Sequence, residues 1–422
     1  MELEDMILVS IDDHIIEPPD LFNGRMPAKY KDDAPQFATT ADGADQWVFQ
    51  GNSAGPVGIG ATASWPLEEW GIDPVGHAEM RPGCYDLDER IRDMNANGVY
   101  ASMNFPTMAG FSGSYLARAK DQDLVAATVS AYNDWHLDEW CGQHPDRFIP
   151  LSILPFYSPD KAAAEIYRMA KRGCTAFTIP ETPYLLDLPS FQSDYWAPIF
   201  KAAVDTDMTM CLHIGLAIRM IPNPDGMDEG RMIIMGPQVT AVVANDLLSQ
   251  GVFKRFPDLK VALSEGGIGW IAGYLDRADN VVQQHVWTQT DVSGVGMSPT
   301  EVFQKNMLAC FIGDKTALRV RDRIGIDNIA WECDYPHTDS TWPRSPEMLF
   351  EQLTGAGCTD EEINKITFEN SCRFFNWDPF KHGKREDATV GALRARALDV
   401  DVSTTPKAVY RARYEAKLAA GV

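Results

Sequence analysis

The chain alternates between short apolar segments and longer amphipathic ones along most of its 422 residues. Apolar, β-branched strands between amphipathic helices are typical of a parallel sheet covered on both faces. Eight strand–helix units predict an α/β fold of the (β/α)8 TIM-barrel type. A doubly wound open sheet is the alternative, but no GxGxxG or Walker loop follows the first strand. The predicted strands are Met6–Val9, Val99–Phe105, Phe148–Leu154, Thr175–Ile179, Thr209–Gly215, Lys260–Ser264, Met307–Ile312 and Asn328–Cys333.

Helix start and stop signals support this alternation. Asp86 with Glu89 three residues later predicts a capping box, and Gly98 predicts the end of the same helix. Ser158 and Pro159 suit the cap and first turn of another helix. The further helical segments are Ala119–Cys141, Ser193–Asp205, Val239–Gln250, Lys315–Arg323, Ser345–Leu353 and Thr359–Phe375.

Two segments fall outside the repeating units. Residues 20–85 are rich in proline, glycine and aspartate, and we predict an insertion after strand 1 that contains a small hairpin around Gln46–Gln50. Residues 383–422 contain few large apolar side chains and predict a C-terminal helical arm. The expected organisation is a barrel over residues 1–382 followed by this arm.

The charge and the termini exclude several function classes. The formal net charge is −23, which repels nucleic acid and anionic membranes, so neither is expected as a partner. No apolar stretch approaches a membrane span, and the acidic N-terminus lacks a signal peptide's basic start. The eight scattered cysteines contain no CxxC and suggest reduced thiols. We expect a cytoplasmic protein.

Polar residues stand at the ends of several predicted strands. Asp12 and His14 lie two residues apart, so on a strand they point the same way and offer a carboxylate and an imidazole to a cation. A lone Asp-x-His is short and common, and a locally hydrogen-bonded histidine is the alternative. The ends of other strands carry Glu181, His213, Glu265 and Asp334, and catalytic residues of a barrel gather at this edge. The combined set favours a metal site, although Glu181 is expected to have no role.

Four motifs resemble the amidohydrolase superfamily. They are Asp12-x-His14, Cys211–Gly215, Phe256–Val261 leading into Ser264–Gly267, and Trp331–His337. The resemblance is to the "amidohydrolase 2" branch, typified by aminocarboxymuconate-semialdehyde decarboxylase, and spans roughly residues 6–378. It implies a (β/α)8 barrel that binds one divalent metal ion. By position, the resemblance implies the ligands Asp12, His14, His213 and Asp334.

The chain departs from this family at two positions. The family commonly has His-x-His or Glu-x-His on strand 1, where this chain has Asp12 and His14. An oxygen ligand makes the site harder, so we expect zinc first, with manganese and iron as alternatives. On strand 6 the family usually has a histidine before Gly-Gly, where this chain has Glu265.

The expected catalytic residues are Asp334, which can accept and return a proton beside the metal, and Glu265. An anionic substrate needs a cation in so acidic a protein. The expected substrate contacts are Arg81, Arg219 in the predicted lid loop Leu216–Gly236, His337 and Trp342.

Two enzyme functions follow from the resemblance. The first is non-oxidative decarboxylation of a small aromatic or unsaturated carboxylic acid. The second is metal-dependent hydrolysis of an amide, lactone or related bond. A barrel that has kept only its fold is a third alternative, against which the complete set of predicted ligands argues. Product analysis distinguishes the two enzyme functions: a decarboxylase releases CO2, whereas a hydrolase yields a cleaved amide or ester.

The C-terminal arm generates a prediction about assembly. Because Gly391–Leu418 lacks the apolar residues to form a core alone, we expect it to pack on another subunit of a dimer or higher oligomer. Sedimentation at micromolar protein concentration should then show a species of at least twice the chain mass. A monodisperse monomer would contradict this expectation.

Overall fold

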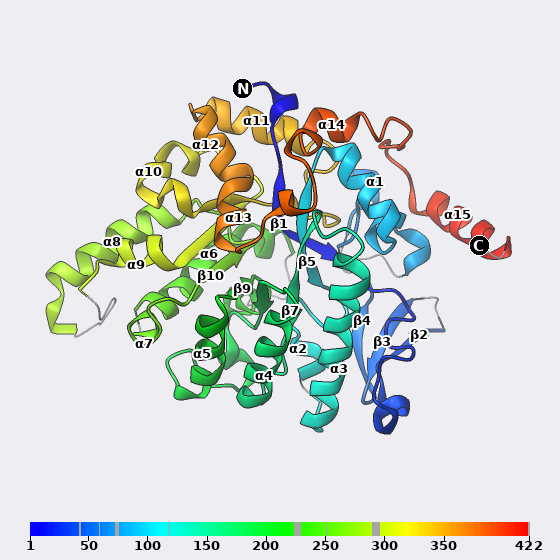
Figure 1. The fold of residues 1–422 in the computed structure, drawn as a ribbon, viewed down its shortest axis with the longest axis horizontal. Coiled ribbons are helices and arrows are strands. Elements are labelled where there is room, and N and C mark those ends of the chain that lie inside the picture. Colours follow the sequence, from blue (N-terminus) through cyan, green and yellow to red (C-terminus); the bar gives the residue numbers. More distant parts are fainter. Residues whose placement is uncertain are drawn as a thin grey trace. The chain divides into compact units, whose positions relative to one another are not determined.

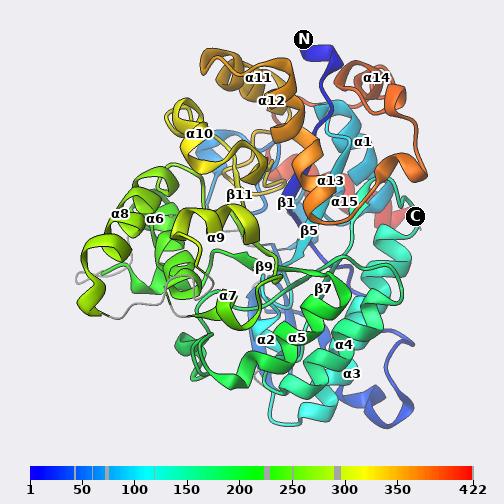
Figure 2. The ribbon, with the colours of Figure 1, turned by 60° about the vertical axis from the view of Figure 1, so that its left-hand side comes forward.

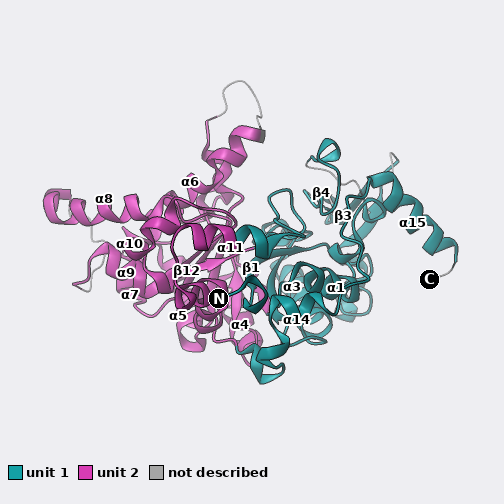
Figure 3. Cartoon of the chain, turned by 90° about the horizontal axis from the view of Figure 1, so that it is seen from above, with its two compact units in different colours: residues 1–149, 333–349, 378–422 teal, residues 150–332, 350–377 magenta. Residues whose placement is uncertain are grey.

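A computed structural model describes residues 1–41, 44–58, 60–71, 76–117, 119–222, 229–249, 251–288 and 296–420. The chain divides into two compact units (Figure 3). Unit 1 contains residues 1–149, 333–349 and 378–422, and unit 2 contains residues 150–332 and 350–377. The fold is mixed α/β with parallel sheets, as the alternation in the sequence predicts.

Unit 1 contains a parallel sheet of the order β1-β5-β6 (Figure 1). Its strands are β1 (Val9–Ile15), β5 (Ala101–Pro106) and β6 (Phe148–Ile149). Strand β1 starts later and runs further than predicted, so Asp12 and His14 lie within it. Ser10 pairs with Ser102 but Asp13 pairs with Asn104, which leaves one extra residue on β1. This irregularity is a β-bulge, a feature that redirects side chains.

The helices of unit 1 follow their sequence signals. The Asp86 side chain accepts a 3.1 Å hydrogen bond from the Glu89 N–H, and Gly98 ends α1 with φ +78°. The predicted helix 119–141 is observed as α3 followed by a π-helical turn at His136–Cys141. The helices are α1 (Leu87–Asn97), α2 (Ser114–Ala117), α3 (Gln122–Trp135), α14 (Val390–Arg394) and α15 (Lys407–Ala419).

The insertion after β1 contains the expected small sheet. Strands β2 (Gln36–Thr39), β3 (Asp45–Phe49) and β4 (Asn52–Pro56) pair antiparallel in this order. The buried Trp47 ring lies edge-on to Phe22 and Phe37, with centroids 5.7 and 5.4 Å away. The hairpin predicted around residues 46–50 is confirmed as β3.

The C-terminal arm packs on unit 1 of its own chain. Val390 and Leu393 of α14 are buried, and the Val390 N–H donates to the Met6 carbonyl. Further along, the Thr405 N–H donates to the Ser64 carbonyl, and Tyr410 of α15 is only 4% exposed. The arm therefore adds side chains to its own unit's core, which its sparse apolar composition did not indicate.

Unit 2 contains a parallel sheet of the order β12-β11-β10-β9-β8-β7, with every residue buried. Its strands are β7 (Leu151–Ile153), β8 (Ala176–Thr178), β9 (Thr209–His213), β10 (Val261–Ser264), β11 (Met307–Phe311) and β12 (Ile329–Trp331). Helices cover this sheet, and α4 and α5 lie side by side (Figure 2). They include α4 (Pro159–Ala170), α5 (Ala197–Thr206), α6 (Glu229–Leu248), α7 (Val252–Arg255), α8 (Ile271–Gln284), α9 (Pro299–Asn306), α10 (Arg321–Ile324), α12 (Asp360–Asn364) and α13 (Asn370–Phe374).

The structure corrects the predicted lid loop. Helix α6 begins at Glu229, ten residues before the predicted start, and includes Pro237. The last eight residues of the predicted loop, 229–236, are therefore helical, and residues 223–228 lie outside the described part of the chain. All eight cysteines lie among the described residues, and none forms a disulfide there. Within the described residues, no helix has both the length and the apolarity to cross a membrane.

A buried ion pair joins the insertion to α1 in unit 1. The Arg81 guanidinium donates to both carboxylate oxygens of Asp93, at 2.7 and 2.6 Å. The Tyr335 hydroxyl donates to the same carboxylate at 2.7 Å, and the Arg81 guanidinium stacks on the Trp342 ring, 4.4 Å from its centroid. Removal of one partner of a buried pair leaves an uncompensated charge, which is strongly destabilising.

We predict that Asp93→Asn lowers the free energy of unfolding by about 3–5 kcal/mol, because it keeps the side-chain shape but leaves the Arg81 charge buried without its counterion. Denaturant unfolding followed by circular dichroism measures this change. The matched control is Asp194→Asn, whose carboxylate is 97% exposed in an ion pair with Arg255 and should leave the midpoint nearly unchanged. Equal effects of the two variants would contradict the prediction.

Candidate metal centre

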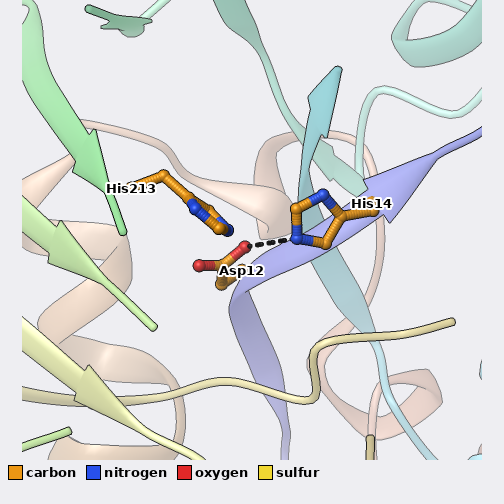
Figure 4. Close-up of side chains that lie close together, drawn as sticks. All are labelled: Asp12, His14 and His213. Carbon is orange, nitrogen blue, oxygen red and sulfur yellow. Dashed lines mark ion pairs between the residues drawn. The ribbon is translucent and has the colours of Figure 1, made fainter. Parts of the chain in front are cut away.

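Two carboxylates and one imidazole converge on a single point in unit 1. The His14 Nε2 atom lies 3.5 Å from Asp12 Oδ1 and 3.4 Å from Asp334 Oδ1, and the three side chains are 0% exposed. Figure 4 shows the Asp12 carboxylate directed at the His14 ring. The structure therefore brings together three of the four predicted metal ligands within this unit.

Backbone hydrogen bonds hold these side chains in place. The segment that follows β12 runs beside β1, where the Asp334 N–H donates to the Asp12 carbonyl at 2.8 Å and the His14 N–H donates to the Tyr335 carbonyl at 2.7 Å. The Cys333 N–H donates to Ser10 Oγ at 2.8 Å. Asp334 has φ +57°, a left-handed conformation that is uncommon for aspartate and often marks functional positions. The main chain thus fixes the separation of the two carboxylates.

His337 lies against the same group. Its Nδ1 atom is 3.0 Å from Asp334 Oδ1, and its ring centroid is 3.8 Å from that of His14. His14, Asp334 and His337 each offer one ligand atom, and these atoms lie within 4.8 Å of one another. His337 therefore lies beside Asp334, and its expected role as a substrate contact stays a prediction.

A buried arginine supports the strand that carries the ligands. Arg90 of α1 is 0% exposed and donates to the Gly83 carbonyl at 2.6 Å and the His14 carbonyl at 2.5 Å. Burial raises the pKa of neighbouring Asp13 to about 6, and the positive charge of Arg90 opposes this shift. The sequence analysis did not single out Arg90 or Asp13. For Arg90, one local pattern indicated burial: it lies on the same face of α1 as the apolar Met94.

Unit 2 positions a second pair at neighbouring strand ends. His213 ends β9, and its Nε2 atom lies 3.4 Å from Glu265 Oε2. Glu265 follows β10 with φ +56°, and its N–H donates to the Glu332 carboxylate at 3.1 Å. The His213 side chain is 0% exposed and that of Glu265 is 26% exposed. Glu265 is therefore held beside an imidazole with part of its carboxylate open to solvent.

Glu181 has a structural partner in unit 2. Its Oε1 atom accepts a 2.7 Å hydrogen bond from the Ala217 N–H, at the start of the 3-10 helix Ala217–Met220. Burial raises the pKa of this carboxyl, and the bond from Ala217 opposes the shift. The expectation that Glu181 has no chemical role is consistent with this position. The same 3-10 helix carries Arg219, whose side chain is exposed.

Two predicted substrate contacts serve the fold instead. Arg81 is buried and paired with Asp93, which engages its guanidinium through two nitrogens. Trp342 lies under that guanidinium, and its indole N–H donates to the Asp93 carbonyl at 3.2 Å. These contacts argue against substrate binding by either residue. The sequence alone could not show whether these two residues bind substrate or stabilise the fold, because packing decides which side chain an arginine pairs with.

The donor set of unit 1 fits a divalent cation. Two ionised carboxylates without exposed surface repel one another, and one histidine supplies at most one positive charge. Mixed carboxylate and imidazole donors suit zinc, manganese and iron. The histidine nitrogen within 3.5 Å of both carboxylates provides a preformed cluster of donors rather than an isolated pair.

Two curated relatives are decarboxylases. The chain is 25% identical over 280 residues to gamma-resorcylate decarboxylase of Polaromonas sp., a match that covers 61% of this chain and 79% of the relative. It is 24% identical over 327 residues to 2-amino-3-carboxymuconate-6-semialdehyde decarboxylase of Dictyostelium discoideum, covering 74% of this chain and 82% of the relative.

Solved structures show the same fold. The 5-carboxyvanillate decarboxylase of Sphingomonas paucimobilis matches with a TM-score of 0.62 and 19% identity, covering 88% of this chain and 99% of that one. The dihydroxybenzoic acid decarboxylase of Polaromonas sp., crystallised with bound manganese and 2-nitroresorcinol, matches with a TM-score of 0.56 and 17% identity, covering 90% and 98%.

The family assignment rests on a match to most of the chain. The Amidohydro_2 family model, described as amidohydrolase, matches residues 61–377. Strand β1, with Asp12 and His14, precedes the matched range, whereas His213, Glu265 and Asp334 lie within it. The resemblance inferred from the strand-end motifs is confirmed, and the chain belongs to the amidohydrolase family.

Proposed function

We propose that the protein is a metal-dependent decarboxylase of a small aromatic or unsaturated carboxylic acid. The observation that carries this proposal is the convergence of the fully buried Asp12 and Asp334 carboxylates on His14. A site of this kind in a chain of the amidohydrolase family needs a cation, and the curated relatives above are decarboxylases.

We also propose that the parallel strands close into an eight-stranded barrel. Strands β6 and β7 are separated only by Pro150, and they correspond to the single predicted strand 148–154. At the other end, the segment after β12 hydrogen-bonds to β1 through Ser10 and Asp12. In this arrangement residues 20–85 form the insertion after strand 1, and residues 383–422 form the arm.

The proposed ligands are Asp12, His14 and Asp334 from unit 1 and His213 from the end of β9. When bound, a divalent ion at these donors supplies a Lewis acid that polarises a substrate oxygen. Manganese bound in the neighbouring dihydroxybenzoic acid decarboxylase supports manganese beside zinc for this chain, because two carboxylate ligands suit a harder ion.

Asp334 is the proposed proton carrier. In each turnover Asp334 takes up one proton and then delivers it to the substrate carbon that bears the carboxylate. The carbon–carbon bond then breaks, its electron pair returns to the ring or conjugated chain, and CO2 leaves. The buried position of Asp334 excludes competing solvent protons, and its backbone bond to Asp12 holds the carboxyl group in place. Exposed Arg219 is the remaining candidate for an anionic substrate's carboxylate.

Hydrolysis of an amide or lactone is the second candidate. Glu265 beside His213 favours it, because a partly exposed carboxylate at that position can accept a proton from an attacking water. Asp334 is the alternative acceptor of this one proton, which then passes to the departing amine or alkoxide.

We predict that purified protein, reconstituted with manganese or zinc, contains one divalent ion per chain by elemental analysis. It should release CO2 from 2,6-dihydroxybenzoate, 5-carboxyvanillate or a related acid. Asp12→Asn should lose most of the bound metal and most of the CO2 release, because a neutral amide is a weaker ligand. Cleavage of amides or lactones without CO2 release would favour the hydrolase. Absence of a stoichiometric ion after supplementation would refute both.

Glu265→Gln keeps the side-chain shape and removes the charge. If Glu265 binds the metal or transfers a proton, turnover should fall by about 10²-fold or more, the usual scale for a positioned acid or base. The metal content falls with it if Glu265 is a ligand and stays constant if Glu265 acts on bound water. The control is Glu351→Gln, whose carboxylate is 76% exposed. Normal turnover and metal content in Glu265→Gln would show that this position is structural.

A further inference from the structure

A second imidazole lies beside the proposed metal ligands of unit 1. His337 is next to two of them, His14 and Asp334. The question is what this additional imidazole does.

The backbone around His337 is tightly held. The His337 N–H donates to the Asp334 carbonyl at 2.8 Å, which closes a turn. The Pro336 carbonyl in this turn accepts bonds from the N–H groups of Thr62 and Ala63 in the insertion, at 2.9 and 3.1 Å. The imidazole is thus anchored on both sides rather than carried by a free loop, and its side chain is only 10% exposed.

The packing of the ring leaves it facing the carboxylate. Phe111 and His14 lie against the His337 ring, with centroids 5.7 and 3.8 Å away. Gly60, with φ +72°, packs close enough that an added Cβ would lie 3.8 Å from His337 Cδ2. These contacts restrict the ring to an orientation in which Nδ1 points to Asp334.

The distances match those between neighbouring ligands of one ion. Ligand atoms about 2.1 Å from a metal and about 90–110° apart are separated by about 3.0–3.4 Å. His337 Nδ1 and His14 Nε2 lie 3.0 and 3.4 Å from the same oxygen, Asp334 Oδ1. Their ligand atoms also lie within 4.8 Å of one another.

Two other histidines of unit 1, His77 and His136, have contacts elsewhere. His77 Nε2 lies 3.3 Å from the Glu17 carbonyl, and the His136 ring lies beside Cys141 Sγ. His382 is exposed in the arm. His337 is therefore positioned as the second imidazole of the buried carboxylate cluster.

We propose that His337 is a direct ligand of the proposed metal ion, beside His14 and Asp334. The proposal rests on the metal site of the proposed function but not on the reaction catalysed there. It assigns His337 to the ion rather than to the substrate, and it leaves Glu265 as a carboxylate beside His213.

Two substitutions separate a metal ligand from a residue that only hydrogen-bonds to Asp334. His337→Asn places an amide N–H where Nδ1 lies, so it can keep the bond to Asp334, but an amide is a poor ligand for a transition metal. His337→Phe keeps a ring of similar packing and removes both functions. His382→Asn is the matched control at an exposed histidine.

The measurement is Co²⁺ binding to the full-length apoprotein, by competition with a chromophoric chelator and by the visible spectrum of the bound ion. We expect both His337 variants to bind Co²⁺ at least tenfold more weakly and to show a changed spectrum, while the control matches the wild type. Unfolding midpoints measured in chelator establish that the variants are folded.

The outcomes distinguish this proposal from the proposed function. Wild-type affinity and spectrum in His337→Asn, with a loss only in His337→Phe, would show that His337 merely orients Asp334 and would overturn the proposal. Wild-type behaviour of both variants would also overturn it. Weak binding by both variants in a protein that releases no CO2 would support the ligand and refute the decarboxylase. A wild type that binds no Co²⁺ would refute both.

Discussion

The site depends on the burial of two carboxylates around one imidazole. Asp12 and Asp334 have no exposed surface, and both lie within 3.5 Å of His14 Nε2. When both carboxylates are ionised they repel one another, and a cation between them relieves this repulsion. The backbone bond from Asp334 to the Asp12 carbonyl holds the two segments together, so the fold itself brings these donors to one place.

The surrounding residues serve this arrangement. Arg90 donates a hydrogen bond to the carbonyl of His14, and its positive charge lowers the pKa of Asp13 against the effect of burial. Arg90 therefore stabilises the strand that carries the ligands. Arg81, paired with Asp93, joins the insertion to α1. Both arginines have structural contacts within unit 1. Thr62 and Ala63 also bond to the Pro336 carbonyl and so hold the turn before His337.

Similarity to known proteins and the geometry of the site support different parts of the argument. The family match covers His213, Glu265 and Asp334, and the structural neighbours establish the fold. The structure adds the contacts of Glu265 and His337 in this chain. A carboxylate lies beside His213 and an imidazole beside Asp334, which is a reason to test the reaction rather than to transfer it from relatives.

The sequence by itself determined the parallel α/β fold, the approximate positions of most strands, and the polar strand ends, whereas β1 lies later in the chain than predicted. Each of these follows from local patterns: hydrophobic period, helix caps, and two side chains two residues apart. Only the tertiary structure decided which partner each charged side chain has. It paired Arg81 with Asp93, twelve residues away, buried Arg90 under His14, and packed the sparse C-terminal arm on its own chain. Such pairings depend on which surfaces the fold brings together, and no local pattern encodes that.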